Sequence, residues 1–383
     1  MSRSHLRMPN TKFAFEIIKR SRKSGARLGV LHTAHGSLKT PAFVAVATNG
    51  ALKHVTWRQA EETGCELVFC NTAHFLTNAD CAQIQLMGGL HALLGRRTKP
   101  LITDSSGFQV FSWGNELVIK VDKQTGITFK SYRDGRLFNV SPESCIRTQT
   151  QLGADIILVL DELLGMDGSS RERTEQSLTL CESWADRCLS EHERLGGFNT
   201  ATQALFGIVH GGYFTDLRVR SAKFLAARPF DGFALGGSLG KGPASGNDQA
   251  RDAIAAALCE LPDCKPRHLL GIGDLPSIRA AVPFGIDTFD SSFPTMIGRH
   301  GSAICGFDTP LLRIRESKFA AMHSRPVDES CDCETCRSCS LSYLHHLYKC
   351  NEPVLATLLA VHNLTAMHRC FATIREEIAN DSL

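Results

Sequence analysis

Three cysteines lie close together near the C-terminus, in the order Cys331-x-Cys333-x2-Cys336, and His362 follows within an apolar segment. Thiols packed this closely, in a chain whose other cysteines are mostly scattered singly, indicate a metal site rather than disulfide bonds. Three thiolates and one imidazole complete the tetrahedral ligand set of a structural zinc ion. Spacing alone does not choose the ligands, because further candidates lie nearby: Cys339, Cys350, His345 and His346.

Acidic side chains end several short apolar segments. Asp104 ends one of them, Asp161 with Glu162 ends another, and Asp290 ends a third. Two carboxylates can divide the work at a glycosidic bond, since one attacks the anomeric carbon and the other moves protons. A single aspartate at such a position is often only a helix cap or turn former. Three of them converging on one site indicate catalysis.

Other residues near these segment ends suit a flat ligand. Glycines such as Gly107 and Gly237 let the backbone approach the edge of a base, and the ring of Phe108 can stack on its face. Gly271-x-Gly273 is only a two-glycine turn and is not a nucleotide fingerprint. The pair His32 and His35 is spaced three apart, whereas two metal ligands on one strand face need a spacing of two, so we expect no metal there.

Eight short apolar segments must position these side chains. They are rich in valine, isoleucine, leucine and phenylalanine and cover residues 41–48, 65–72, 100–107, 154–162, 204–212, 232–237, 268–273 and 287–293. Such segments are typical of strands buried on both faces. Because helical patterns lie between most of them, the sequence predicts an α/β fold, a (β/α)8 barrel with its functional groups at the carboxyl ends of the strands. A doubly wound open sheet is the alternative, but no glycine fingerprint follows the first segment.

Two regions depart from this alternation. Residues 113–140 alternate with period two around Gly126 and Gly135, which predicts an inserted antiparallel hairpin region. The cysteine-rich region predicts an appended metal subdomain. We therefore expect a catalytic barrel over residues 1–304, a zinc-binding subdomain over 305–365, and a C-terminal helix over 366–383 that packs on the barrel.

Composition excludes some classes of protein. The 383 residues carry a formal charge of +3 and 43% hydrophobic residues, as globular proteins do. The basic N-terminal segment lacks the apolar core of a secretory signal, and no apolar run approaches the length of a membrane span. We expect a cytoplasmic protein with no membrane partner. The charge neither requires nor excludes a nucleic-acid partner.

Taken together, these motifs resemble the tRNA-guanine transglycosylase family. The similarity covers nearly the whole chain and includes TDSSGFQVFS (103–112), DIILVLDE (155–162), FGIVHGG (206–212), GFALGGSLG (232–240) and DTFDSSFPT (287–295), followed by the C-x-C-x2-C motif and HNL (362–364). Members exchange guanine in certain tRNA anticodons for a 7-deazaguanine. They are (β/α)8 barrels with a zinc subdomain that helps to dock tRNA, and the resemblance implies the same here.

The resemblance also implies roles for single residues. Asp290 matches the family's nucleophile and Asp104 its general acid/base. The positions that match the base-binding residues are Ser105, Ser106, Gly107, Phe108, Asp161, His210, Gly237 and Gly240. The positions that match the ligands of one structural Zn2+ per subunit are Cys331, Cys333, Cys336 and His362, which leaves the neighbouring thiols and imidazoles as bystanders.

The resemblance further implies an RNA surface and partners. The matching RNA-contact positions are Gly271, Ile272, Gly273, Asp274, Leu275, Pro276, Ser277, Thr295, Met296, Ile297, Gly298 and Arg299. The expected substrates are tRNAs with a GUN anticodon, those for aspartate, asparagine, histidine and tyrosine, together with queuine or preQ1. A homodimer is the expected assembly.

Some positions depart from the bacterial members. His210 stands where they usually carry glutamine, and Ser106 where they usually carry glycine. Asp274 and Met296 replace basic residues, which weakens the expected contacts to phosphate or guanine. The alternative is a non-catalytic, zinc-containing tRNA-binding subunit of a heteromeric enzyme. The retention of both aspartates and all four zinc ligands argues against it.

Gly240 bears on the choice of base. Bacterial enzymes that use preQ1 typically carry valine there, and eukaryotic enzymes that use queuine carry glycine. A missing branched side chain leaves room for the cyclopentenediol group of queuine. We therefore favour queuine over preQ1. The alternative is that Gly240 serves only a local turn and has no bearing on the base.

Overall fold

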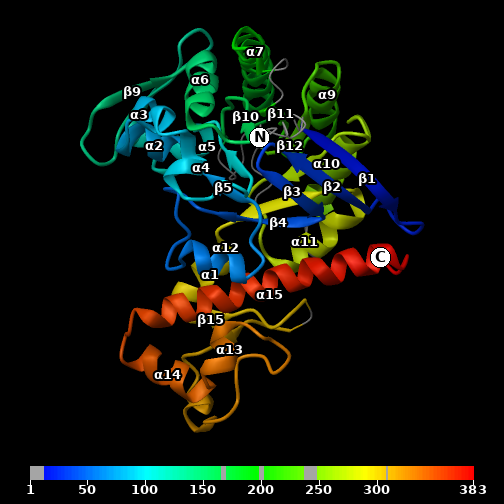
Figure 1. The fold of residues 1–383 in the computed structure, drawn as a ribbon. Coiled ribbons are helices and arrows are strands. Elements are labelled where there is room, and N and C mark those ends of the chain that lie inside the picture. Colours follow the sequence, from blue (N-terminus) through cyan, green and yellow to red (C-terminus); the bar gives the residue numbers. More distant parts are fainter. Residues whose placement is uncertain (1–12, 165–169, 198–201, 237–247, 308) are drawn as a thin grey trace, which may run out of the picture.

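A closed barrel of eight parallel strands forms the centre of the computed structural model, which describes residues 13–164, 170–197, 202–236, 248–307 and 309–383 (Figure 1). The strands follow one another around the barrel in chain order, and the last pairs with the first. Their bounds are Ala42–Val46 (β4), Val68–Cys70 (β5), Leu101–Thr103 (β6), Ile156–Leu158 (β10), Ala204–Val209 (β11), Gly232–Leu235 (β12), Arg267–Leu269 (β13) and Thr288–Ser291 (β14). Each predicted apolar segment contains or overlaps one of them. The barrel prediction is confirmed, and an open sheet is excluded.

Helices surround the barrel. They are Trp57–Glu62 (α1), Thr72–Asn78 (α2), Cys81–Leu86 (α3), Gly89–Leu93 (α4), Gly107–Ser112 (α5), Pro142–Leu152 (α6), Arg171–Arg194 (α7), Thr215–Ala226 (α9), Asp248–Leu258 (α10), Leu275–Ala281 (α11) and Phe293–Arg299 (α12), with 3-10 turns at Asn115–Leu117 (η1) and Val282–Phe284 (η2). Local sequence explains their ends: α6 begins where the hydroxyl of Ser141 accepts the Ser144 amide and ends at Gly153, whose φ is 71°. Within the described residues, none of the helices combines the length and apolar character needed to cross a bilayer.

A three-stranded antiparallel sheet precedes the barrel, and it was not predicted from the sequence. Its strands are Ala14–Arg20 (β1), Arg27–Thr33 (β2) and Gly36–Thr40 (β3). The guanidinium of Arg27 is fully buried and pairs with Asp287, just before β14, at 2.9 and 2.5 Å. His35, in the β2–β3 turn, bonds to Asp155, just before β10. The sheet therefore packs against the amino ends of the barrel strands, opposite the expected site.

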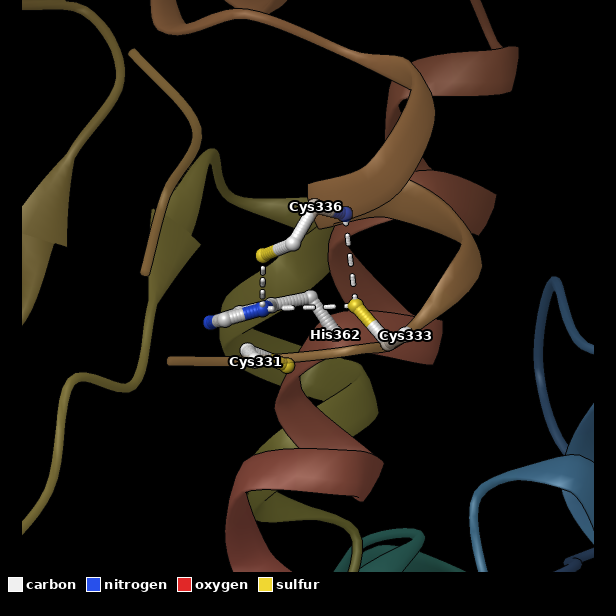
Figure 2. Close-up of side chains that lie close together, drawn as sticks. All are labelled: Cys331, Cys333, Cys336 and His362. Atoms are coloured by element: carbon white, nitrogen blue, oxygen red, sulfur yellow. Dashed lines mark hydrogen bonds between the residues drawn. The ribbon is translucent and has the colours of Figure 1, made fainter. Parts of the chain in front are cut away.

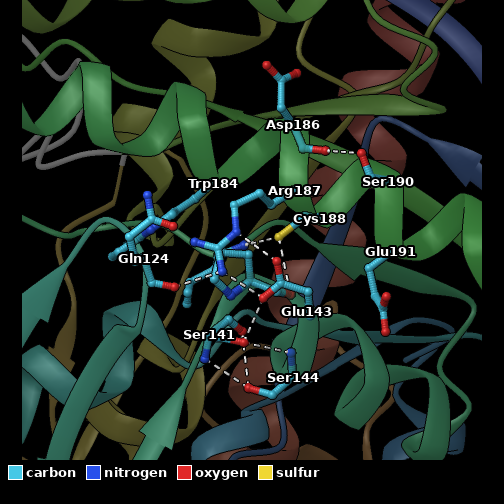
Figure 3. Close-up of polar contacts among 12 residues, drawn as sticks. Gln124, Ser141, Glu143, Ser144, Trp184, Asp186, Arg187, Cys188, Ser190 and Glu191 are labelled. Atoms are coloured by element: carbon cyan, nitrogen blue, oxygen red, sulfur yellow. Dashed lines mark hydrogen bonds and ion pairs between the residues drawn. The ribbon is translucent and has the colours of Figure 1, made fainter.

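The predicted insertion is a second antiparallel sheet, with strands Val118–Asp122 (β7), Gly126–Lys130 (β8) and Leu137–Val140 (β9). Arg187 on α7 holds it to the barrel (Figure 3). This guanidinium donates to the carbonyls of Lys123 and Gln124 at the β7–β8 turn, at 2.6 and 2.9 Å. It also donates to both carboxylate oxygens of Glu143 on α6, at 2.7 and 2.8 Å. The prediction of an antiparallel insertion is confirmed.

The C-terminal region has its own small apolar core. Its elements are Ser302–Ala303 (β15), Leu312–Arg313 (β16), Ser317–Ala321 (η3), Glu334–Ser338 (α13), Leu341–Lys349 (α14) and Val354–Ala379 (α15). Helix α15 runs between this region and the barrel (Figure 1). It packs closely on α12, since a Cβ at Gly298 would lie only 2.9 Å from the Ala360 amide nitrogen. The boundary expected at residue 365 falls inside α15, and this one helix contacts both the metal subdomain and the barrel.

Candidate active site and metal cluster

Four polar side chains gather at the carboxyl end of the barrel. Asp104 follows β6, Asp161 lies three residues beyond β10, His210 follows β11, and Asp290 lies within β14. Their exposed fractions are only 5, 6, 4 and 6%. Because parallel strands of a barrel end at the same mouth, the fold brings these predicted residues together.

Asp104 is held by hydrogen bonds from the neighbouring strand end. Its Oδ2 accepts from the side-chain amide of Asn71 at 2.6 Å, and its Oδ1 accepts from the backbone amides of Thr72 and Ser106 at 2.7 and 3.2 Å. Burial nevertheless raises the pKa of Asp104 to about 6, and the charge of Asp290 acts in the same direction. A carboxyl with this pKa can both give and take a proton near neutral pH.

Asp290 has a different environment. Its Oδ1 lies 3.0 Å from Nε2 of His268 and accepts a hydrogen bond from the Gly271 amide at 2.9 Å. Within the described residues, no hydrogen bond reaches Oδ2. One oxygen is therefore fixed and the other remains available, as a nucleophile requires.

Asp161 and His210 lie close together, because they follow the neighbouring strands β10 and β11. Ser105 donates to Oδ1 of Asp161 at 2.7 Å, whereas Nε2 of His210 lies 3.5 Å from Oδ2, too far for a strong bond. Burial raises the pKa of Asp161 to about 6. Burial, with the charge of Arg218, lowers the pKa of His210 to about 3, so the imidazole is neutral. Oδ2 and Nε2 can thus both bind an incoming base edge.

The loop after β6 has an unusual backbone. Ser106 has a φ of 77°, in the left-handed region that glycine prefers, and its buried hydroxyl has no hydrogen-bond partner among the described residues. Gly107 must lack a side chain, because a Cβ would lie 2.3 Å from the carbonyl oxygen of Asp161. Phe108 is 54% exposed, so its ring is free to stack on a ligand. Gly237 and Gly240 lie outside the described residues.

The expected RNA-contact segments are only partly at the surface. Gly271, Pro276 and Met296 are exposed, and Asp274 and Arg299 are partly exposed. The others are buried: Ile272, Gly273, Leu275, Ser277, Thr295, Ile297 and Gly298. Asp274 accepts a hydrogen bond from the Ser277 amide at 2.9 Å and so caps α11. Of the expected positions, only these few are accessible at the surface.

Cys331, Cys333, Cys336 and His362 form a compact group whose ligand atoms all lie within 4.8 Å of one another (Figure 2). Nδ1 of His362 lies 3.3 Å from Sγ of Cys336, and its Nε2 lies 2.9 Å from the Ile304 carbonyl. A carbonyl only accepts, so Nε2 carries the proton and Nδ1 presents its lone pair to the thiols. Hydrogen bonds among the three thiols lower the pKa of Cys331 and raise the pKa of Cys336, so the thiols share their protons as one coupled group. The donor set fits a metal ion.

A second group of side chains that could bind a metal lies at the opposite end of the barrel. His35 and His91 bond to separate oxygens of Asp155, at 2.8 and 3.0 Å. Their rings stack at 3.5 Å with planes 16° apart. Parallel rings direct their lone pairs side by side rather than toward one point. Hydrogen bonding to a buried carboxylate explains this group without a metal.

His268 was not among the predicted site residues. It lies inside an apolar segment and is 1% exposed, so nothing in its local sequence separates it from core residues. The signal that finds it is pairing register: His268 on β13 lies opposite Thr288, two residues before Asp290 on β14.

Several known proteins similar to this chain carry the same name. A family model described as queuine tRNA-ribosyltransferase matches residues 21–383. A queuine tRNA-ribosyltransferase from Protochlamydia amoebophila (strain UWE25) is 41% identical over 97% of this chain and 96% of its own length. Those from Chlamydia muridarum (strain MoPn / Nigg) and Chlamydia felis (strain Fe/C-56) are 41% and 40% identical, each over 96% of this chain and 99% of their own.

Proposed function

Since the chain belongs to the queuine tRNA-ribosyltransferase family, a family of tRNA-guanine pentosyltransferases, we propose that it exchanges guanine-34 of GUN anticodons for a 7-deazaguanine. The observation that carries the proposal is the unequal pair of buried carboxylates in one barrel mouth. Asp104 has its pKa raised to about 6, and Asp290 has one oxygen fixed and one available. Such a pair divides proton transfer from nucleophilic attack.

The reaction proceeds by two displacements. Guanine-34 must first be turned out of the anticodon loop. Oδ2 of Asp290 gives an electron pair to C1′, the bond from C1′ to N9 breaks, and guanine leaves with those electrons and a proton from Asp104. Asp104 then takes the N9 proton of the incoming base, N9 attacks C1′, and the Asp290 carboxylate departs. Two inversions retain the sugar configuration.

The other polar groups of the mouth would select the base. Oδ2 of Asp161 and Nε2 of the neutral His210 lie 3.5 Å apart and would bind the same base edge, and the exposed ring of Phe108 can stack on a flat ligand. With Gly240 in place of valine, we favour queuine over preQ1, because the larger base gains room. The tRNAs for aspartate, asparagine, histidine and tyrosine would be the substrates.

The thiol–imidazole cluster would hold one Zn2+ through Cys331, Cys333, Cys336 and His362. Bound there, the ion supplies structure and no chemistry, because all four ligand positions are filled by protein. The partly exposed residues of α12 and the neighbouring metal subdomain would form part of the tRNA surface. A homodimer in the cytoplasm completes the proposal.

Exchange of radiolabelled guanine into an anticodon stem-loop tests the function. The wild-type chain should incorporate guanine, and Asp290→Ala should not. Denaturing gels of stem-loop incubated with base analogue should show a covalent adduct only with an intact Asp290. If neither label nor adduct forms with any GUN stem-loop, the chain is instead a tRNA-binding subunit, and stem-loop binding without exchange would identify it.

Competition between the two bases tests the substrate. Equal concentrations of queuine and preQ1, offered to a labelled stem-loop, should yield mainly the queuine product. Gly240→Val should reverse that preference, since a branched side chain discriminates by about 1–3 kcal/mol. Efficient use of preQ1 alone by the wild type contradicts the queuine assignment while leaving the exchange reaction intact.

A further inference from the structure

We propose that His268 is a positioning residue that orients the attacking carboxylate of Asp290, an inference that rests on the proposed function. Its Nε2 lies 3.0 Å from Oδ1 of Asp290. The imidazole is 1% exposed, so it has no solvent to compete with this bond. The bond fixes one carboxylate oxygen and directs the other toward the sugar.

The fold sets this contact through strand register. Thr288 and Asp290 are two residues apart on β14, so their side chains point to the same side of the strand. β13 runs parallel to β14 with His268 opposite Thr288. His268 therefore lies just below Asp290 on the neighbouring strand, and its ring stacks on Phe69 of β5 at a centroid distance of 6.1 Å and an angle of 14°.

Asp290 and Thr288 contact the two ring nitrogens of His268. An ionised carboxylate only accepts, so Nε2 of His268 must be the donor to Asp290. The other ring nitrogen, Nδ1, lies 2.8 Å from the hydroxyl of Thr288. Both ring nitrogens are thus satisfied in a single orientation. A threonine, a histidine and an aspartate form a chain of hydrogen bonds that ends at the nucleophile.

The hydrogen bonds from Thr288 through His268 act together with a second contact of Asp290. The amide of Gly271 also donates to Oδ1, at 2.9 Å. Two donors on one oxygen leave Oδ2 as the atom that can approach C1′, and they prevent the carboxyl from rotating between attack positions. Misplacement of a reacting atom by about 1 Å can cost about a hundredfold in rate. Loss of the His268 bond should therefore slow attack more than it weakens binding.

Two polar substitutions of His268 separate positioning from packing. In His268→Gln the amide nitrogen occupies the place of Nε2 and can still donate to Asp290. In His268→Asn the shorter amide reaches only the place of Nδ1, beside Thr288. Both variants remove the ring, so loss of packing should affect them alike. His368→Leu, on α15 away from the mouth, controls for removal of a partly buried histidine.

The decisive measurement is the single-turnover rate of covalent adduct formation with an anticodon stem-loop. His268→Asn should be about ten- to a hundredfold slower than wild type, and His268→Gln should stay within about threefold, because one hydrogen bond to a charged group separates them. Thr288→Val should show a smaller loss. The dissociation constant of the stem-loop should be unchanged in all three.

Equal rates for His268→Gln and His268→Asn would overturn the inference, whether both are fast or both are slow, because the donor would then be irrelevant. A slow His268→Asn with an equally weakened stem-loop affinity would overturn it too, since the defect would lie in binding. Wild-type protein and Asp290→Ala are measured in the same series. If the wild type forms no adduct, the proposed function fails, and this outcome is distinct from failure of the positioning role.

Discussion

Asn71 donates a hydrogen bond of 2.6 Å from its side-chain amide to Oδ2 of Asp104 and so joins the ends of β5 and β6. This donor favours the ionised carboxylate, while burial favours the protonated acid. Burial has the larger effect, and the pKa of Asp104 rises to about 6. The balance between these two effects is what allows one residue to serve as acid in the first displacement and as base in the second.

Replacing Asn71 by alanine should shift the pH profile of guanine exchange. The change removes a donor to the carboxylate, so the pKa of Asp104 should rise further and the limb near pH 6 should move to higher pH. Exchange rates measured from pH 5 to 9 under single-turnover conditions would show it. A Thr77→Ala variant, which alters a buried hydroxyl on α2 outside the mouth, should keep the wild-type profile. If the pH profile of Asn71→Ala is the same as that of the wild type, Asp104 is not the group whose titration controls the rate.

Ser106→Gly should stabilise the protein by about 1 kcal/mol. Serine at a φ of 77° is strained, and its buried hydroxyl meets no partner in the part of the chain that the structure describes, so glycine removes two unfavourable features. Urea unfolding measures the difference. Ser105→Gly is the matched comparison and should destabilise, because the Ser105 hydroxyl bonds to Asp161 and accepts from the Gly107 amide. A stability loss in Ser106→Gly would mean that its hydroxyl has an unrecognised partner.

Cys336→Ser should lose bound metal, whereas Cys339→Ser should keep it. The two residues are three apart, but Cys336 belongs to the group that faces His362 and Cys339 does not. Elemental analysis of both purified variants measures metal per chain. Limited proteolysis should then cut Cys336→Ser first within the metal subdomain, since that region has only a small apolar core of its own. Equal metal content in the two variants would contradict the ligand assignment.

The sequence predicts the barrel well, because strands buried on both faces must be short, continuous and apolar. The strand β11, buried at every position, is an example. The N-terminal sheet was missed although β2 alternates buried and half-buried residues, the period-two signal of a sheet with one covered face. The continuous helix α15 was divided in two, because metal ligands and barrel-packing residues were assigned to separate units.

Some residues of the candidate site could likewise be predicted from the sequence, and others could not. The aspartates that end apolar segments can be picked out from the sequence, because a charged residue next to a buried strand is unfavourable unless it has a specific role. His268 is invisible, because its importance depends on lying opposite Thr288, and register between two parallel strands is set by the closed barrel as a whole. The contacts of Asp155 with His35 and His91 also join segments far apart in the chain. Long-range pairing of this kind leaves no local pattern.

Asp104→Asn should change how stability depends on pH. The pKa of Asp104 is about 6 in the folded chain and 3.8 as the ordinary value, so the folded state binds the extra proton between these limits. The contribution of this group to stability is therefore fully present below about pH 4 and is lost as pH rises through 6, a change of ~3 kcal/mol. Asparagine does not titrate, so the stability of the variant relative to the wild type should increase as pH rises. Thermal unfolding at pH 4.5 and pH 7.5 measures the gain, and the difference in melting temperature, variant minus wild type, should be more positive at pH 7.5. A difference that is equal at both pH values would show that the buried carboxyl is compensated when ionised, and that its proton is held no more tightly than in the unfolded chain.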